Sequence, residues 1–578
     1  MASSDIYDLV VIGAGSSGVV SARFYLDVHP DAKVVVLERD NAVGGVWSSE
    51  RVYPGFKSQG STRMGGFSDI PLSPRPEQID QDDFYDANAM ATYLDEYVNK
   101  HVYSGQTLRD RIRFGIKVDS LDKTVHGWRV KCVGPSGSQS FETRKVIAAS
   151  GSTSEANVPE FRGRDTFKGP VVHTLNFGRS RILQREDIKT VAVVGGGKSA
   201  ADHAYQSVKA GKQVHWIIRK SGKGPGGFSE MKAGGPWHNV TELVCTRFFP
   251  NLLFFPGLKP ASWWETFIFK TRLGQWVYSK LEHAVTQKTI DTARYDDRPG
   301  ARDSFSQLKT KSRGFSFIVP LGAISHEDFW DTIAQNVDIH HEDIDRVDAA
   351  SIILSNGEIL EADAIICGTG FNRGCSFFSR EQQVELGLPH PEAWDDTETV
   401  KEWAKLNAEA EKVVRKRYYS LNPPPEPPEN FGDIKPDNTP YRLYQMIAPI
   451  NGDRSIALVG YGAYSNMFAG SEVAAIWATA YLDGVLKLPC ERQREQDVAY
   501  VTTYMRLRFP AYGRLGSFFN FDLISQLDRM LDELGLKSHR KSKSWLQDLF
   551  LPLLVKDFAG LKDEYLEKYG GGGGTRSA

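Results

Sequence analysis

The chain has 578 residues, which is too long for one hydrophobic core, so we expect two or three domains. Its 70 basic and 72 acidic residues leave a net charge of −2, without the basic excess that would suggest a nucleic-acid partner. The hydrophobic fraction of 41% is ordinary for a soluble globular protein.

The five cysteines are scattered, and none forms a CxxC pair, which argues against a zinc knuckle or a dithiol redox centre. An odd number of cysteines fits a reducing compartment, and the first strand begins too early to leave room for a signal peptide. We find no run of about 18 uncharged apolar residues of the kind that spans a membrane. The sequence therefore predicts a cytoplasmic protein, with peripheral membrane contact as the alternative.

Residues 8–38 carry the pattern of a dinucleotide-binding βαβ unit. A buried strand, DLVVI, runs into GAGSSG, where Gly13, Gly15 and Gly18 have the G-x-G-x-x-G spacing. A helical stretch and a second strand, KVVVLE, then lead to Glu38, twenty residues after the last glycine. The glycines would let a diphosphate approach the helix N-terminus, and the carboxylate would bind ribose hydroxyls. This site suits FAD.

The same pattern recurs at 190–220. A strand, Gly195, Gly197, a helix and a second strand follow one another, but this strand ends in Arg219 and Lys220 instead of an acid. A carboxylate there would repel a 2′-phosphate, whereas a guanidinium can bind it in a fork. The second site therefore suits NADPH rather than NADH. The simpler alternative for Arg219 is a solvated charge that follows a strand.

Four further segments complete the pattern. Residues 146–159 and 357–372 are strands followed by small-residue turns, which predict chain crossings between the two nucleotide domains. Residues 455–484 predict a strand, a glycine-rich loop and an alanine-rich helix, whose N-terminus would lie against the flavin ring. Residues 422–430 are rich in proline and predict an exposed, extended linker.

Residues 221–330 interrupt the second nucleotide domain and include an aromatic segment at 248–278. We expect this segment to form a buried cap over the substrate pocket. A surface that contacts a membrane or admits substrate is the alternative.

These patterns predict an α/β fold with two Rossmann-like dinucleotide-binding domains, for FAD and NADPH, the second inserted in the first, together with a helical and aromatic insertion. We expect the FAD-binding domain at 1–165 and 356–490, and the NADPH-binding domain at 166–355 with its insertion at 221–330. Residues 491–578 would form a C-terminal helical extension with a disordered glycine-rich tail.

Five further motifs follow one another along the chain. Together with the glycine loops, they resemble the motifs of the flavin-containing monooxygenases, a family of class B flavoprotein monooxygenases. They are GGVW at 44–47, FSDIP at 67–71, FKGPVVHTLNF at 167–177, GGGKSAAD at 195–202 and CGTGF at 367–371. The third contains the identifying FxGxxxHxxx(Y/F) sequence of the family, as Phe167, Gly169, His173 and Phe177. The resemblance spans residues 6–490 and leaves the C-terminal extension uncovered.

The resemblance implies that NADPH reduces FAD, that O2 adds to the reduced flavin at C4a, and that a soft nitrogen or sulfur of a small apolar molecule takes the distal oxygen of the C4a-(hydro)peroxyflavin. The cofactor performs the chemistry, while the protein holds it and excludes water. The family also has a Baeyer–Villiger branch that oxygenates ketones, usually with Trp in the place of Phe177. Phe177 followed by Gly178 therefore favours oxygenation of a heteroatom, and ketone oxygenation is the alternative. A non-enzymatic NADP(H)-sensing protein is the alternative of another class.

The resemblance also assigns catalytic positions. Gln59 takes the place of an Asn that, in animal members, lies eight residues before the aromatic residue of FSDIP, so its amide would donate to the peroxyflavin or to NADP⁺. Asp69 would lie near the flavin, although a turn cap is an equally simple role for it. His173 is expected to hold the inter-domain linker by hydrogen bonds and to set how NADPH meets the flavin, without moving the proton of the reaction.

The residues expected to bind the cofactors come from the glycine loops, the strand ends and the family motifs. They are Gly13, Gly15, Ser17, Gly18, Glu38, Arg39, Gly45, Val46, Trp47, Met64, Gly151, Gly195, Gly197, Lys198, Ser199, Arg219, Lys220, Thr369 and Gly370. No metal ligands are predicted, and the expected partners are a small apolar substrate and O2.

Overall fold

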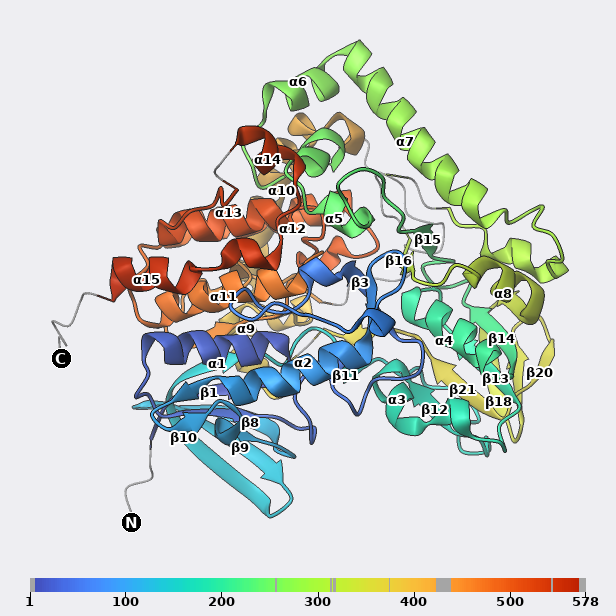
Figure 1. Cartoon of the computed structure of the whole chain (residues 1–578), viewed down its shortest axis with the longest axis horizontal. Coiled ribbons are helices and arrows are strands. Elements are labelled where there is room, and N and C mark those ends of the chain that lie inside the picture. The colour runs from blue at the N-terminus through green and yellow to red at the C-terminus, as the bar shows by residue number, and fades with distance from the viewer. Residues whose placement is uncertain are drawn as a thin grey trace.

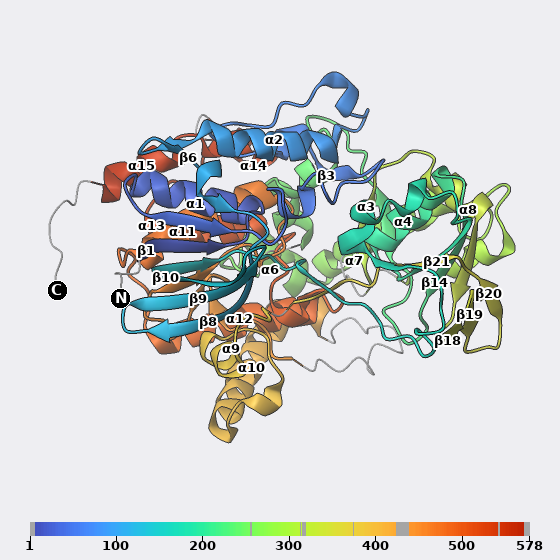
Figure 2. The same ribbon diagram turned by 90° about the horizontal axis from the view of Figure 1, so that it is seen from below.

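The computed structural model describes residues 6–254, 257–311, 314, 319–373, 375–422, 438–541 and 544–570 (Figure 1). Most of the proline-rich linker predicted at 422–430 and nearly all of the glycine-rich tail lie outside these residues. Within them, two separate sheets stand side by side, and each carries its own helices (Figure 2). The predicted α/β fold with two Rossmann-type domains is confirmed.

The first domain is built on a seven-stranded mixed sheet. Its strands are β1 (Tyr7–Ile12), β2 (Val34–Leu37), β7 (Ile112–Arg113), β8 (Lys117–Thr124), β9 (Gly127–Gly134), β10 (Gly137–Ala148) and β25 (Ile456–Leu458). They lie in the order β7-β2-β1-β10-β9-β8, and β25 also pairs with β10. β1 is parallel to β2 and β10, and helix α1 (Ser16–Val28) follows it directly, as the βαβ pattern predicts.

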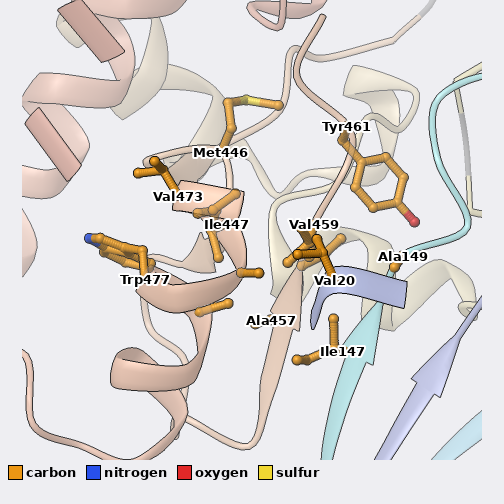
Figure 3. Close-up of a cluster of buried hydrophobic side chains, with 14 of the residues drawn as sticks. Val20, Ile147, Ala149, Met446, Ile447, Ala457, Val459, Tyr461, Val473 and Trp477 are labelled. Carbon is orange, nitrogen blue, oxygen red and sulfur yellow. The ribbon is translucent and has the colours of Figure 1, made fainter. Parts of the chain in front are cut away.

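Helix α11 (Met467–Leu482) lies at the centre of the core of the first domain. Its sequence is apolar on all sides, and a helix of that kind is stable only when it is buried. It packs against α1, and its Val473 and Trp477 belong to one buried cluster with Ile147 and Val459 (Figure 3). The alanine-rich helix predicted from the sequence therefore supports the sheet from within the core.

The second domain is a five-stranded parallel sheet with the order β12-β21-β13-β14-β17. The strands are β12 (Val171–His173), β13 (Thr190–Val194), β14 (Gln213–Ile218), β17 (Val337–His341) and β21 (Ala364–Cys367). Helix α4 (Lys198–Lys209) follows β13 and gives the second predicted βαβ unit. A small antiparallel sheet follows β17, with β18 (Ile344–Asp348), β19 (Ser351–Leu354) and β20 (Ile359–Glu361).

The chain crosses between the two domains twice, and the two crossings lie side by side. β11 (Glu155–Ala156) pairs with β22 (Phe371–Asn372) in an antiparallel ribbon. This confirms the crossings predicted within 146–159 and 357–372. The predicted boundary at 355–356 is wrong, because β21 joins the second sheet and the chain returns to the first domain only after β22. A short apolar strand fits either sheet by pattern alone, and its parallel partners decide between them.

The insertion at 221–330 leaves and rejoins the second domain through a parallel strand pair, β15 (Gly227–Glu230) and β16 (Leu321–Ile324). Between these strands the described residues form mainly helices, of which α5 (Val240–Val244), α6 (Trp263–Lys270) and α7 (Arg272–Ala293) are α-helices. α6 and the start of α7 occupy an extremity of the molecule (Figure 1). The predicted helical character of the insertion is confirmed.

The C-terminal extension is also helical, as predicted. It contains α12 (Glu491–Arg508), α13 (Leu523–Leu534), α14 (Trp545–Phe550) and α15 (Leu561–Tyr569). α13 packs on α11, and α12 packs on α10 (Thr397–Arg417), so the extension covers the first domain. Among the described residues no helix is both long and apolar enough to cross a membrane.

A buried ion-pair network joins α1 to α11. The Arg23 guanidinium contacts the Glu472 carboxylate at 3.1 Å and the Asp27 carboxylate at 2.8 Å, and its Nε donates to the Tyr97 hydroxyl of α2 (Ala87–Lys100). Glu472 also accepts hydrogen bonds from the Ser68 N–H and hydroxyl. The network fixes the FSDIP loop to the two central helices.

Replacing Glu472 by alanine is expected to lower the free energy of unfolding by about 3 kcal/mol, because the buried Arg23 guanidinium loses a carboxylate partner. The matched control is Glu402→Ala, which breaks the exposed pair with Arg492 and should cost about 0–1 kcal/mol. Urea unfolding of the FAD-loaded proteins, followed by circular dichroism, measures both. Equal losses in the two variants would contradict a stabilising role for the buried network.

Candidate functional site

The first glycine loop leaves an open surface at the N-terminus of α1. Gly13 has a φ of 102°, and a Cβ there would lie 2.7 Å from the Ala149 carbonyl oxygen, so only glycine fits. A Cβ on Gly15 would meet only Gly45, at 3.8 Å. No side chain caps α1, which leaves the N–H groups of its first turn available. This arrangement suits a diphosphate.

Glu38 lies at the end of β2, as predicted, and is buried. Its carboxylate accepts hydrogen bonds from the backbone N–H groups of Ala14 at 2.7 Å and Asp40 at 2.9 Å. Burial raises the pKa of this carboxyl despite those two donors. Each oxygen keeps a lone pair, so Glu38 can also accept from ribose hydroxyls.

The GGVW loop lies against the first glycine loop. Gly44 forms a parallel bridge with Gly15 and donates its N–H to the Ala14 carbonyl at 2.9 Å. Gly45 therefore lies beside the open face of Gly15, and Val46, next along the chain, is exposed. The two loops meet at the N-terminus of α1, and contact of Gly45, Val46 and Trp47 with FAD stays a prediction.

An aromatic row connects this loop to the second domain. Trp47 stacks on Phe56, which stacks on Tyr53, with ring centroids 5.3 and 4.9 Å apart. Tyr53 meets the edge of Phe177 at 4.9 Å, and Phe177 stacks on His203 of α4 at 4.0 Å. The last aromatic residue of FxGxxxHxxxF is thus an inter-domain packing residue.

Other predicted FAD ligands are in contact with the protein or buried. The Ser17 hydroxyl bonds to that of Ser471 at 2.8 Å, and Met64 is buried. The Arg39 guanidinium donates to the Ser154 carbonyl at 2.7 Å. Gly151 differs, since a Cβ there would meet nothing within 4 Å.

His173 holds the chain crossing, as predicted. Its Nε2 lies 2.7 Å from the Gly370 carbonyl oxygen, and its Nδ1 accepts the Leu175 N–H at 3.1 Å. These partners fix a neutral imidazole with its proton on Nε2. Burial lowers the pKa of His173, which favours the same form. Thr369 donates to the Asn157 carbonyl across the crossing, so Thr369 and Gly370 serve this junction.

Asp69 belongs to the ion-pair network of Arg23. Its carboxylate lies 2.7 Å from Nε2 of His101 and accepts from the Tyr97 hydroxyl, within the Arg23 network. These charged and polar partners are the reason that it turns toward α2. These contacts give Asp69 a structural role, and its catalytic role stays a prediction.

The second glycine loop repeats the geometry of the first. Gly195 has a φ of 132° and approaches the Gly368 carbonyl, while a Cβ on Gly197 would meet only Pro320, at 3.9 Å. Helix α4 begins at Lys198 without a side-chain cap, and Ser199 is half-buried in its first turn. Lys198 forms an ion pair with Asp202. The N-terminus of α4 is therefore open and uncapped, like that of α1.

The basic pair after β14 divides into two environments. The Arg219 guanidinium is exposed and forms no ion pair with any residue that the structure describes. Lys220 pairs with Glu342 at 2.7 Å. Of the two, Arg219 is the side chain available to a phosphate beside the second glycine loop.

A pocket of about 220 Å³ lies where the two domains meet the C-terminal extension. Gln59, in the middle of the first-domain strand β3 (Lys57–Ser61), and Lys198 of α4 both line it. The other lining residues are Leu321, Arg373, Ala463, Tyr512, Ser517, Phe518 and Asn520. Asp69 and His173 do not line it.

The C-terminal extension supplies a wall that the sequence analysis missed. Tyr512, Phe518 and Asn520 lie outside every motif of the resemblance. The Tyr512 hydroxyl accepts the Leu321 N–H at 2.8 Å, which joins the extension to the insertion. Of the described residues of the insertion, only Leu321 lines this pocket, so the cap predicted at 248–278 stays a prediction.

Arg373 was also missed, although it follows CGTGFN directly. Its guanidinium is half-buried and forms no ion pair within the described chain. Together with Lys198 it gives the pocket two cations.

One further cluster brings metal-ligand types together. Ligand atoms of Asp83, His238 and Glu242 lie within 4.8 Å of one another. Glu242 is paired with Arg63 and accepts from the Ser61 hydroxyl, and His238 pairs with Asp83 at 2.6 Å. These contacts satisfy the cluster as an ion-pair network.

A family model described as pyridine nucleotide-disulphide oxidoreductase matches residues 10–230, which contain both glycine loops. That segment holds a single cysteine, Cys132, and so lacks the cysteine pair of a disulfide reductase. The match therefore reflects the shared architecture of two dinucleotide-binding domains.

Two solved structures share the fold. Cyclohexanone monooxygenase with bound epsilon-caprolactone has a TM-score of 0.58 at 16% identity, over 92% of this chain and 99% of that chain. S-allyl-L-cysteine S-oxygenase from Allium sativum has a TM-score of 0.51 at 14% identity, over 98% of this chain and 99% of that chain. In sequence, FAD-dependent monooxygenase resA of Aspergillus sclerotiorum is 31% identical over 586 residues, which cover 97% of this chain and 98% of the relative. Because the identity of 31% extends over 97% of this chain, the chain belongs to the family of FAD-dependent monooxygenases.

Proposed function

We propose that this protein is an NADPH- and O2-dependent monooxygenase that oxygenates a nitrogen or sulfur atom of a small apolar molecule. The observation that carries the proposal is the shared pocket, in which Gln59 of the first domain and Lys198 of the second line one space. A reaction that passes from NADPH through FAD to a substrate needs both nucleotide sites to open onto one place.

The backbone N–H groups at two helix N-termini fit the two cofactors. Helices α1 and α4 both begin at a glycine loop without a side-chain cap, and the space beside Gly15 and Gly197 is open. Two free helix N-termini suit the diphosphates of FAD and NADPH. FAD, when bound, supplies the redox chemistry with O2, and NADPH supplies the hydride.

The residues of the pocket would position the substrate and exclude water. The Gln59 side-chain oxygen lies 3.4 Å from the Ala323 N–H, which leaves its amide NH2 group free to donate within the pocket. Leu321, Ala463 and Phe518 provide apolar surface. Tyr512 holds the C-terminal wall against β16 and so keeps the pocket closed on that side.

Ketone oxygenation is the second candidate, and one observation favours it. A carbonyl carbon is attacked by an anionic oxidant, which nearby cations stabilise. Lys198 and Arg373 both line the pocket, and Arg373 lies near Lys223, where burial and the charges of Arg514 and Arg373 lower the pKa of the lysine to about 8. Phe177, in the place of the Trp that is usual in the Baeyer–Villiger branch, favours oxygenation of a heteroatom. The two candidate reactions are therefore separated by experiment.

The deciding experiment incubates the FAD-loaded protein with NADPH, O2 and a panel of methyl phenyl sulfide, N,N-dimethylaniline and cyclohexanone. We expect a sulfoxide or N-oxide that carries one added oxygen atom, detected by mass spectrometry. A lactone alone would assign the protein to ketone oxygenation. FAD-loaded protein that consumes no NADPH with O2 present, with or without the panel, would contradict both readings and favour an NADP(H) sensor.

Arg219→Ala is expected to raise the KM for NADPH roughly 10- to 100-fold and to leave the KM for NADH unchanged, because a charge-assisted phosphate contact is lost. Steady-state NADPH and NADH oxidation measures both constants. Arg346→Ala removes an exposed arginine of the same domain and serves as the matched control. Equal use of NADPH by the Arg219 variant and the parent would refute the 2′-phosphate assignment.

His173→Ala is expected to slow reduction of the flavin by NADPH about tenfold, because a buried hydrogen bond that fixes the domain crossing is lost. FAD content should stay at the level of the parent, since His173 does not touch the first glycine loop. Stopped-flow flavin absorbance gives the rate, and released FAD gives the content. His126→Ala, on the exposed β8–β9 turn, is the control. Loss of FAD with an unchanged reduction rate would overturn this role.

A further inference from the structure

The joint between α6 and α7, together with the end of α10, presents an exposed apolar surface, which we call the corner surface. Its large side chains are unusually open to solvent: Trp263 79%, Leu273 60%, Trp276 59%, Val413 54% and Tyr419 47% exposed. Figure 1 shows that α6 and the start of α7 form an extremity of the molecule. An apolar group of this size at a protruding point indicates a binding surface.

Contacts between elements make the corner surface one unit. Glu265 of α6 forms a two-pronged ion pair with Arg417 of α10, with distances of 2.6 and 3.0 Å. The Phe269 ring meets the edge of the Tyr418 ring at 5.5 Å, and the Lys270 ammonium donates to the Lys416 carbonyl. These contacts hold α6 against the end of α10, so the exposed tryptophans and Val413 lie on elements that are packed together.

The charged groups of this surface have one sign. Lys270, Arg272, Lys412 and Lys416 are exposed, and none forms an ion pair within the described residues. Glu265 is buried and neutralised by Arg417, and Glu411 is paired with Arg415 and Arg506. Back along α10, the first exposed acid is Glu409, one turn before Val413. The corner surface is thus apolar and cationic together.

A hollow of about 380 Å³ opens in the same place. Lys270, Lys416 and Arg417 line it, with Thr266, Ala261, Val413 and the buried Glu265. A space of this size with ammonium groups at its edge suits a phosphate-bearing headgroup.

We propose that the corner surface binds the anionic face of a lipid membrane. Trp263, Leu273 and Trp276 would enter the interface, where tryptophan is favoured, while the lysines meet anionic headgroups. A protein partner fits less well, because protein interfaces are depleted in lysine. Membrane contact would also place the enzyme beside a source of apolar molecules.

The test is flotation of the full-length, FAD-loaded protein with vesicles of phosphatidylcholine containing about 30% phosphatidylserine, against vesicles of phosphatidylcholine alone. The parent is expected to float with the anionic vesicles and to bind them at least tenfold more tightly than the neutral ones. Trp263→Ser with Trp276→Ser, and separately Lys270→Glu with Lys416→Glu, should each reduce binding at least tenfold.

Controls change exposed apolar and cationic side chains on the β8–β9 hairpin: Val125→Ser for the tryptophan variant, and Lys117→Glu with Lys131→Glu for the lysine variant. These should bind as the parent does, and all variants should keep parental FAD content and melting temperature, since every changed side chain is exposed. Absence of flotation by the parent, or equal loss in the control variants, would overturn the proposal. So would a concentration-dependent dimer, measured by light scattering, that the tryptophan variant abolishes, because it would assign the corner surface to a second copy of the chain.

Discussion

The whole arrangement depends on one constraint: the chain passes between its two sheets twice, at a single place. The β11–β22 ribbon keeps the crossings paired, and His173 ties the strand β12 to the return segment at Gly370. Each glycine loop is built within its own sheet, so the distance between the two sites is set at this junction. The aromatic row from Trp47 to His203 reinforces it from the other side. Charged contacts take part as well, because Arg179 of α3 (Phe177–Ser180) pairs with the buried Asp40 of the first domain at 2.9 Å.

Much of this could be predicted from the sequence, because local signals carried it. The glycine loops, the acid at Glu38 and the basic Arg219 depend on short-range geometry, in which spacing and strand ends determine position. The crossings and the linking role of His173 followed from motif order. Each of these features depends on residues that are contiguous in the sequence. The structure has the two βαβ units, the crossings and the His173 contact at the expected positions.

The errors share one physical cause, which is that partners distant in sequence decide the outcome. β21 has no pattern that distinguishes the two sheets, and only its pairing with β12 and β13 places it. The contacts of Asp69 with Tyr97 and His101 likewise join segments that its own motif does not contain. The pocket wall from Tyr512 to Asn520 has no motif at all, because its role arises from packing against Leu321.

The origin of the pocket wall has a consequence for biogenesis. The lining residues span the chain from Gln59 to Asn520, so no partial product of the ribosome can close the pocket. The first domain also stays incomplete until β25 and α11 are synthesised, since β25 pairs with β10 and α11 packs on α1. All strands of the second domain are synthesised before β25, so the second domain can fold before the first is complete. A nascent chain would thus expose the central strands of the first sheet for most of its synthesis, which makes chaperone capture and cofactor loading late events.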